Sequence, residues 1–505
     1  MAAYMYDRLV TEDEYRQRVR RHRPSSLLPL IAAAAARYGS PQRPQSWLES
    51  PSLKYTPWAL ADAARVCLAY GTEHLRSEAT ERDLLAILAA YSSLKEPTLH
   101  GADEDAVRLR DFMMRLGGEQ MAWQAPEFVS LARTAALYLH TPFPARRQPR
   151  CLVPGWDTEV FGCPLPDYVG TAQLLWGSAL LNAGRFDAAI FDSPDGEKFE
   201  RVVSRETVLR VVERHFATDV ASIRATEKQT MENLAKVAGG KAAQLRRFTY
   251  NPLLGRPAVT GFGAGLLCPS PQLVWRKATP PGIYHTGLEH FGSAFLEETG
   301  YLFEEYVGRQ LRLMPDVDVV GEITYRVKRN ELQSVDWFVI FDDLVLLVEV
   351  KSMMPTENAR LGLERGVAER DGKLTRAYRQ VNATSAQIEQ RHPAFASIPA
   401  DRPRQALIVT LEPFPVANAN LPHVDLPTTD IPTAVVAAQE VERLVTLTGT
   451  TPNSLLLGRA ADPQRSTWAL NECLTGHEGA RNPILDQGWA SYPWSTGRLS
   501  AAGAA

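Results

Sequence analysis

Three charged side chains that could act together on a substrate lie at the ends of two apolar runs. Asp336 comes directly before the first run, and Glu349 and Lys351 come at the end of the second. The pair Asp342-Asp343 separates the runs, which predicts a β-hairpin with a two-residue turn. In that register Asp336 lies opposite Glu349, with Cβ atoms roughly 4.5–5.5 Å apart, and Lys351 shares the face of Glu349.

Such a pair of acids indicates a metal site. Two carboxylates that face each other in an apolar sheet repel and lose hydration, unless a cation compensates. Mg²⁺, for which Mn²⁺ can substitute, binds one or two carboxylates, a main-chain carbonyl and several waters. The expected metal ligands are therefore Asp336, Glu349 and the carbonyl of Val350. Lys351 would orient the attacking water and balance charge on a phosphate.

The alternative is that Glu349 and Lys351 are edge-strand charges that face solvent, with Asp336 beside them. The second run, residues 344–350, is apolar on both faces, which is typical of a buried central strand. Idle charges are costly in such a strand, so the pattern favours a functional site.

The elements that must position these residues follow an α/β order. The expected elements are a helix over 291–313, extended segments over 317–327, 335–341 and 344–350, a helix over 374–390 and a strand over 406–411. Helix, three strands, helix and strand predict a fold of the α/β class, with a central mixed sheet flanked by helices.

The acidic pair and the lysine resemble the motif of the PD-(D/E)XK nuclease family. Asp336 matches the metal-binding aspartate of the family, and residues 349–351 match its E-x-K element. Val335 stands where the name-giving pattern has proline. The resemblance covers about residues 291–413. It implies a restriction-endonuclease-like core, and it implies a metal-dependent hydrolase of phosphodiester bonds with DNA as the expected substrate.

The resemblance also suggests two supporting residues. The first core helix of the family often supplies an acid, and Glu304 lies at the border of an apolar helical arc, with Glu297 as the substitute candidate. The second core helix often carries a glutamine, which corresponds to Gln380. Glu304 and Gln380 therefore join the expected catalytic set.

Basic residues are spread along the chain, which has 55 Lys and Arg against 58 Asp and Glu and a net charge of -3. A uniformly basic nucleic-acid surface is excluded, so any polyanion must be held by local clusters. Arg326, Lys328 and Arg329 directly precede the hairpin and are the expected contacts to a substrate backbone. Exposed loop cations without a specific role are the alternative.

The chain of 505 residues is too long for one ordinary core and is expected to contain several parts. These are a mostly helical accessory or recognition region over 1–250, a hairpin-containing connector over 251–290, the nuclease-like domain over 291–415, and an extension over 416–505 with one clear helix, 433–444. The first region is expected to recognise substrate or to dock a protein partner.

Composition and cysteine usage restrict the cellular setting. The apolar fraction of 45% and charged fraction of 22% are typical of a globular protein. The five cysteines are scattered, which argues against a disulfide framework or a zinc knuckle and for a reducing compartment. The charged N-terminus is unlike a signal peptide, so a cytoplasmic protein without membrane contact is expected.

Together these features predict a Mg²⁺-dependent endonuclease or exonuclease, in a setting that suits a bacterial restriction or phage-defence effector. The alternative from another class is a non-catalytic nucleic-acid-binding or scaffold protein on a nuclease-derived fold. Such a protein would bind with a salt dependence set by phosphate contacts and without need of a metal.

Overall fold

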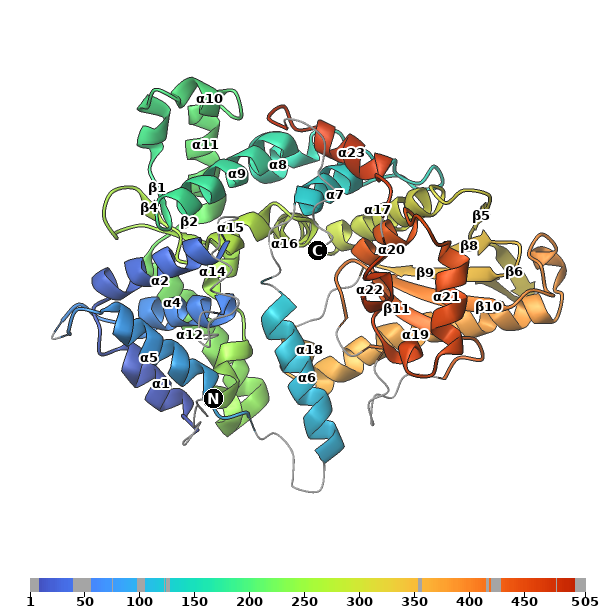
Figure 1. Ribbon diagram of the computed structural model, residues 1–505, viewed down its shortest axis with the longest axis horizontal. Coiled ribbons are helices and arrows are strands. Elements are labelled where there is room, and N and C mark those ends of the chain that lie inside the picture. Colours follow the sequence, from blue (N-terminus) through green and yellow to red (C-terminus); the bar gives the residue numbers. More distant parts are fainter. Residues whose placement is uncertain are drawn as a thin grey trace.

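The computed structural model describes residues 9–39, 56–74, 76–97, 105–121, 123, 128–352, 357–414, 417–418, 428–477 and 479–495. These residues form a mixed α/β structure in which helices predominate, as Figure 1 shows. The helices of the first hundred residues lie at one end of the molecule, and the largest sheet lies at the other (Figure 1).

The sheet that carries the predicted hairpin has five strands in the described residues, in the order β11-β10-β9-β8-β5. The strands are β5 (Asp318–Gly321), β8 (Trp337–Ile340), β9 (Val345–Lys351), β10 (Arg404–Thr410) and β11 (Thr433–Ala437). β9 pairs antiparallel with β8 and parallel with β10, so the sheet is mixed, as the sequence predicts. The seven residues of β9 therefore lie in the interior of the sheet.

The hairpin has the predicted register. Trp337 pairs with Val348 and Ile340 pairs with Val345, and the Phe341 N–H donates to the carbonyl of Leu344 at 2.9 Å. Only Asp342 and Asp343 remain in the turn. Asp336 comes directly before Trp337, the first residue of β8. In the same register it lies opposite Glu349, just beyond the last pair of the hairpin.

The two faces of the sheet pack against different helices, because side chains alternate along a strand. Leu346 and Val348 belong to the core that contains Phe303 of α17 (Ser293–Leu311). Val345 and Leu347 belong to the core that contains Val381 of α19 (Glu364–Glu389). Figure 1 shows α17 above the sheet and α19 below it. The end of β9 therefore lies between the two helical layers, so side chains of α17 and of α19 can both contribute to a site there.

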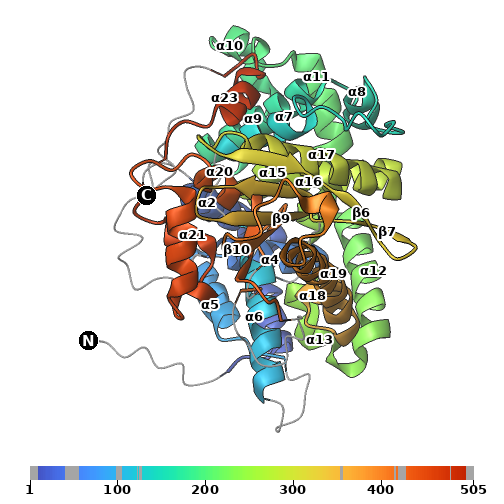
Figure 2. The same ribbon diagram turned by 90° about the vertical axis from the view of Figure 1, so that its right-hand side faces the viewer.

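One extended segment before the hairpin leaves the sheet. β6 (Thr324–Val327) and β7 (Asn330–Gln333) pair only with each other among the described residues, as a ribbon that projects from the molecule (Figure 2). The expected helix over 374–390 is confirmed, and it begins earlier, at Glu364.

The predicted helices of the first half are present. In chain order, the helices of this region are α1 (Glu12–Val19), α2 (Pro24–Gly39), α4 (Pro57–Tyr70), α5 (Glu81–Ser92), α6 (Asp105–Met121), α7 (Phe128–Tyr138), α8 (Trp156–Phe161), α9 (Leu165–Leu181), α10 (Gly196–Glu200), α11 (Arg205–Val211), α12 (Val220–Ala238), α13 (Ala242–Leu245) and α14 (Pro252–Gly255). Short 3-10 helices are η1 (Ala188–Asp192), η3 (Gly239–Lys241) and η4 (Arg246–Phe248), and η2 (Val212–Phe216) is a short π-helix.

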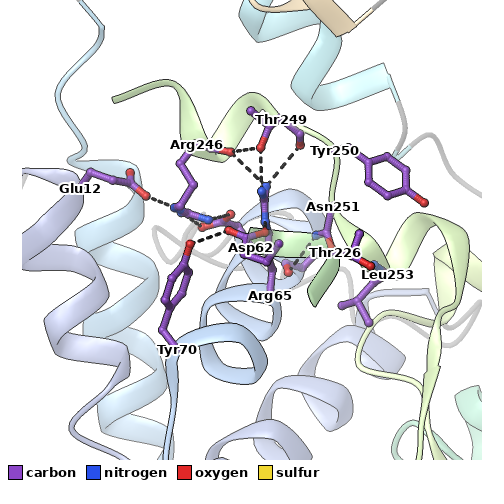
Figure 3. A network of polar contacts seen from close by, with 12 residues as sticks. Glu12, Asp62, Arg65, Tyr70, Thr226, Arg246, Thr249, Tyr250, Asn251 and Leu253 are labelled. Atoms are coloured by element: carbon purple, nitrogen blue, oxygen red, sulfur yellow. Dashed lines mark hydrogen bonds and ion pairs between the residues drawn. The ribbon is translucent and has the colours of Figure 1, made fainter. Parts of the chain in front are cut away.

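A buried network of charged side chains joins α4 to α12 and to Arg246 of η4. The Arg65 guanidinium on α4 donates to Glu227 on α12 at 2.7 Å, and Arg246 donates to both carboxylate oxygens of Asp62 at 2.8 and 2.9 Å (Figure 3). Both arginines are almost wholly buried. Arg65 also donates to the carbonyl of Arg246 and to the hydroxyl of Thr249, and Arg246 also donates to Glu12, so both buried guanidinium charges are paired with carboxylates.

A small second sheet follows, in the order β1-β4-β3-β2, from β1 (Arg185–Phe186), β2 (Ala217–Thr218), β3 (Ala258–Val259) and β4 (Leu266–Leu267). The expected hairpin in 251–290 is present, since Val259 pairs with Leu267. The second strand ends at Leu267, and helices follow it: α15 (Pro271–Lys277) and α16 (Pro280–Phe291).

The prediction of a helix over 433–444 is confirmed only for its second part. Residues 433–437 form β11, and only Ala438–Leu444 form a helix, α20. The segment pairs in parallel with the buried strand β10, and this pairing outweighs its helical spacing. Further helices follow, so the extension holds more than the one expected helix: α21 (Pro452–Ala461), η6 (Arg465–Thr467), α22 (Leu470–Leu474) and α23 (Pro483–Ala490). α18 (Glu357–Arg360) and η5 (Pro393–Phe395) complete the described helices.

The largest apolar core crosses the expected boundaries at 250 and 415. It contains Leu131 of α7, Tyr306 of α17, Val348 of β9 and Trp489 of α23. The Tyr492 hydroxyl, just after α23, donates to the carbonyl of Leu131 at 2.7 Å. Segments that precede the sheet in the sequence and segments that follow it therefore pack in one core with it. In the described part of the chain, no helix has both the length and the apolar character needed to cross a bilayer.

Candidate functional site

Asp336, Glu349 and Lys351 meet where β8 begins and β9 ends. The carboxylate of Asp336 accepts the N–H of Val350 at 2.6 Å, and the Lys351 ammonium donates to the carboxylate of Glu349. Asp336 is 9% exposed and Glu349 is 0% exposed, whereas Lys351 is half-buried. Lys351 and Glu349 thus contact each other, and Asp336 contacts the main chain of the residue between them.

Burial dominates the electrostatics of the two acids. It raises the pKa of Glu349 to about 8, with the nearby charge of Asp336 adding to the effect. It also raises the pKa of Asp336, although the Lys351 ammonium and the Val350 N–H oppose that rise. Burial disfavours the charge of Lys351, but the two carboxylates outweigh it and raise its pKa. The site therefore has a shortage of positive charge.

The main chain of β9 turns the carbonyl of Val350 toward the same place. Each strand residue directs its N–H and C=O to one neighbour, and successive residues alternate. The N–H of Val345 donates to Pro403 at 2.9 Å on the β10 side, so Val350 directs its groups to the β8 side. Its N–H indeed binds Asp336 there. The Val350 carbonyl therefore lies on the side of the Asp336 carboxylate, where no strand residue of β8 is paired with it.

Glu304 on α17 belongs to the same electrostatic cluster. Burial raises its pKa to about 8, and the charges of Asp336 and Glu322 add to that rise. Its carbonyl accepts the indole N–H of Trp337 at 3.0 Å, which fixes this turn of α17 on β8. The substitute candidate Glu297 is exposed and binds Arg150 and Tyr301 instead. Glu304 is thus the acid of α17 that the structure brings to the site.

Sequence reasoning missed Glu322, which lies between β5 and β6. Burial and then the charge of Asp336 raise its pKa, so it adds a further carboxylate to the cluster. An acid inside the extended segment predicted over 317–327 was the available signal. A single acid in that position is too common to stand out in a sequence.

Sequence reasoning also missed two arginines from the loop between α7 and α8. Arg147 opposes the raised pKa of Glu304, and Arg146 and Arg147 oppose that of Glu322. The Arg147 guanidinium lies 4.0 Å from the centre of the Tyr301 ring and donates to its hydroxyl at 2.9 Å. Two adjacent arginines in a proline-rich connection were the available signal. They lie almost two hundred residues before the hairpin, so nothing in the sequence linked them to it.

The buried carboxylate of Glu298 anchors this arginine loop. It accepts the main-chain N–H groups of Arg150, Cys151 and Leu152 at 2.5, 3.0 and 2.8 Å. These bonds outweigh its burial and lower the pKa of Glu298, so it is a structural anion. α17 therefore presents Glu304 to the site and also fixes the loop that brings Arg147.

Gln380 on α19 holds the segment that leads into β8. Its side-chain amide donates to the carbonyl of Ser334 at 2.6 Å, two residues before Asp336. It also lines the pocket beside Lys351. Its contact is thus to the main chain that positions Asp336.

The expected backbone contacts lie on the β6–β7 ribbon. Arg326 forms an exposed ion pair with Glu331 at 3.3 Å. Lys328 and Arg329 form the turn at the tip, since Val327 pairs with Asn330, whereas the root at Ile323 and Ser334 is next to the site. The cations that act on the clustered acids are instead Lys351, Arg146 and Arg147.

The residues at this end of β9 fit a divalent cation. One carboxylate oxygen of Glu349, Oε2, is buried and has no hydrogen-bond partner in the described structure. The described residues contain no group of three or more His, Cys, Asp or Glu side chains arranged to hold a metal ion. The predicted ligands are only two carboxylates and one main-chain carbonyl, those of Asp336, Glu349 and Val350, and a donor set of that kind would suit Mg²⁺ with several waters.

Comparisons of the chain with protein-family models, with curated proteins and with solved structures find no match. The interpretation of the site therefore depends on its own geometry.

Proposed function

We propose that the protein is a Mg²⁺-dependent nuclease with a restriction-endonuclease-like core, and that DNA is its substrate. The main sheet and the helices on its faces follow the order α17, β5, β8, β9, α19, β10, which supports this because it is the helix, three strands, helix and strand predicted from the sequence. A role in restriction or phage defence is part of the same proposal, with the N-terminal helices as the recognition or docking region.

One observation carries the proposal: Glu349 is wholly buried, one of its oxygens has no hydrogen-bond partner, and its charge is opposed by Asp336. Two buried acids share one ammonium, so ionising both would leave an excess of negative charge in an apolar sheet, and without a metal Glu349 keeps its proton at pH 7 instead. A purely structural role gives no reason for that arrangement. A cation between the acids removes the cost.

Each residue has a defined part. Asp336, Glu349 and the Val350 carbonyl would hold the metal, which when bound supplies a nucleophile at neutral pH and neutralises phosphate charge. Lys351 contacts Glu349 and lines the adjacent pocket, and it would orient the attacking water and stabilise the charge that develops on the phosphate. Glu304 would accept hydrogen bonds from waters around the ion, and Gln380 holds the main chain before Asp336.

The test is cleavage by the purified full chain of supercoiled, linear and single-stranded DNA and of RNA, with Mg²⁺, Mn²⁺ or EDTA. Lys351→Ala and Glu349→Gln should each lower the rate by about 100-fold or more, since each removes a group that acts on the reacting atoms. Lys198→Ala and Glu206→Gln are matched controls, because both side chains are exposed and lie in helices outside the site.

Undiminished cleavage in Lys351→Ala and Glu349→Gln would remove the site from the mechanism. Metal-independent binding without cleavage, unchanged in Glu349→Gln, would establish the non-catalytic alternative instead.

A further inference from the structure

A pocket of about 370 Å³ opens beside the clustered acids. Tyr284 of α16 and Leu296 of α17 line one side, and Lys373, Arg376 and Gln380 of α19 line the other. Lys351, at the end of β9, lies between the two sides together with the next residue. The pocket is therefore a slot between two helical layers, and it begins at the lysine of the site.

The two sides of this slot differ in chemistry. Lys373 and Arg376 are exposed and three residues apart on α19, so they project from one face of the helix. Such a pair matches the spacing and charge of a phosphate backbone. Tyr284 is half-buried and presents an aromatic ring across from them. An aromatic ring opposite paired cations is the arrangement with which proteins hold unpaired nucleotides.

The size of the slot limits what it can hold. Pockets for small molecules range from about 300 to 1,000 Å³, so one of about 370 Å³ has room for one nucleotide and not for a base pair. In a duplex each base is stacked and paired, and it must leave the stack before it can contact a ring in such a pocket. A single strand has no such cost.

We propose that this pocket is a subsite for one unpaired nucleotide of a single-stranded nucleic acid, which it holds next to Lys351. Lys373 and Arg376 bind the phosphate on one side, and the Tyr284 ring stacks on the base at the other. This inference rests on the proposed nuclease function and makes it specific, since it selects single-stranded substrate, including a strand end, over intact duplex.

The test is binding of the full chain to a fluorescein-labelled single-stranded 20-mer of thymidines, measured by fluorescence anisotropy in EDTA. The same length of duplex DNA and of single-stranded uridines form the other arms. The single strands should bind at least about tenfold more tightly than the duplex. The ratio between the two single strands shows whether DNA or RNA is preferred, and the proposal requires tight binding of at least one.

Three variants test the residues. Tyr284→Ala should weaken single-strand binding about tenfold, whereas Tyr284→Phe, which keeps the ring, should retain it. The double variant Lys373→Ala with Arg376→Ala should weaken binding and reduce the slope of log K against log salt concentration by about 1.4, which corresponds to two lost contacts on a single strand. Duplex binding should change less in each case.

The matched control removes two exposed lysines of another helix, Lys228→Ala with Lys236→Ala on α12. Their loss changes the net charge by the same amount and should leave the single-strand affinity within about twofold. Equal loss in the control and the pocket variant would mean that overall charge, and not the pocket, holds the strand. That result would overturn the subsite, as would equal binding of duplex and single strand or an unchanged affinity in Tyr284→Ala.

Cleavage distinguishes this inference from the function on which it rests. Metal-dependent cleavage that requires Lys351 but is indifferent to Tyr284 and Arg376 would leave the nuclease standing and remove the subsite. Single-strand binding that depends on the pocket, without cleavage at any metal concentration, would support the subsite and remove the nuclease. Unchanged thermal unfolding of each variant confirms that the chain is folded.

Discussion

Binding of Mg²⁺ should release protons from the site, and Glu349→Gln should reduce the number released. A metal binds the ionised carboxylate, so a carboxyl group that holds a proton must lose it when the ion binds. Burial and the charge of Asp336 raise the pKa of Glu349 to about 8. At pH 7 the metal-free protein therefore holds a proton on this group.

The magnitude follows from that pKa. With a pKa of about 8, Glu349 carries about 0.9 proton at pH 7, and the pKa of Glu304 is raised to about 8 as well. The two groups titrate as a cluster, so binding at pH 7 should release between about one and two protons. Below pH 8 the apparent affinity for Mg²⁺ should rise about tenfold per pH unit for each proton released.

The same shift affects folding stability in a defined direction. The native state keeps the proton of Glu349 up to about pH 8, whereas the unfolded chain loses it near 4.5. This contribution to stability is complete below about pH 4.5 and is lost as the pH rises to 8. Mg²⁺ should therefore raise the unfolding temperature more at pH 8 than at pH 6.

Isothermal titration of Mg²⁺ into the metal-free full chain measures the protons directly. The heats are compared at pH 7 in two buffers of different ionisation enthalpy, and the difference gives the protons released. Glu349→Gln should release about one proton fewer and bind the ion at least tenfold more weakly. Glu206→Gln, which changes an exposed acid of α11, should match the unchanged protein. Equal heats in both buffers, or undiminished binding in Glu349→Gln, would refute the reasoning.

Three further predictions concern the supports of the site. Arg147→Ala should lower the cleavage rate about tenfold. It removes a cation that offsets the negative charge of Glu322, so an anionic substrate should bind less tightly, and substrate titration should show a raised KM. Gly308→Ala should destabilise the protein by about 1–3 kcal/mol, since an added Cβ would lie 2.3 Å from the Trp337 ring; urea unfolding measures the loss, and an unchanged midpoint would contradict it. Leu347→Ala should cost about 2–5 kcal/mol through a cavity in the buried strand, and a loss under 1 kcal/mol would show that the core refills there.

The central hairpin could be predicted because its information is local. Two apolar runs are separated by a two-residue acidic turn, so Phe341 must pair with Leu344. That pair fixes the register of every pair farther from the turn. Asp336, Glu349 and Lys351 follow from that register at the end of the ladder. Glu304 follows from the helical period in the same way.

Residues 433–437 show why local patterns fail elsewhere. Their spacing resembles the helix that continues in α20, but the segment forms β11 beside β10. The main-chain groups of a buried strand edge require partners, and this segment supplies them. A helical pattern in the sequence contains no information about that distant edge.

The sequence by itself determined the strands of the hairpin, the face shared by Glu349 and Lys351, and the chemistry that two opposed acids and an amine can perform. Only the tertiary structure decided that Arg147 and Glu322 join them, that helices α7, α8 and α9 share the core of the sheet, and that a cationic slot with an aromatic side opens at Lys351. The reason is physical. Periodicity records which way a side chain points within its own element, whereas the meeting of elements far apart in the chain depends on how their buried surfaces pack.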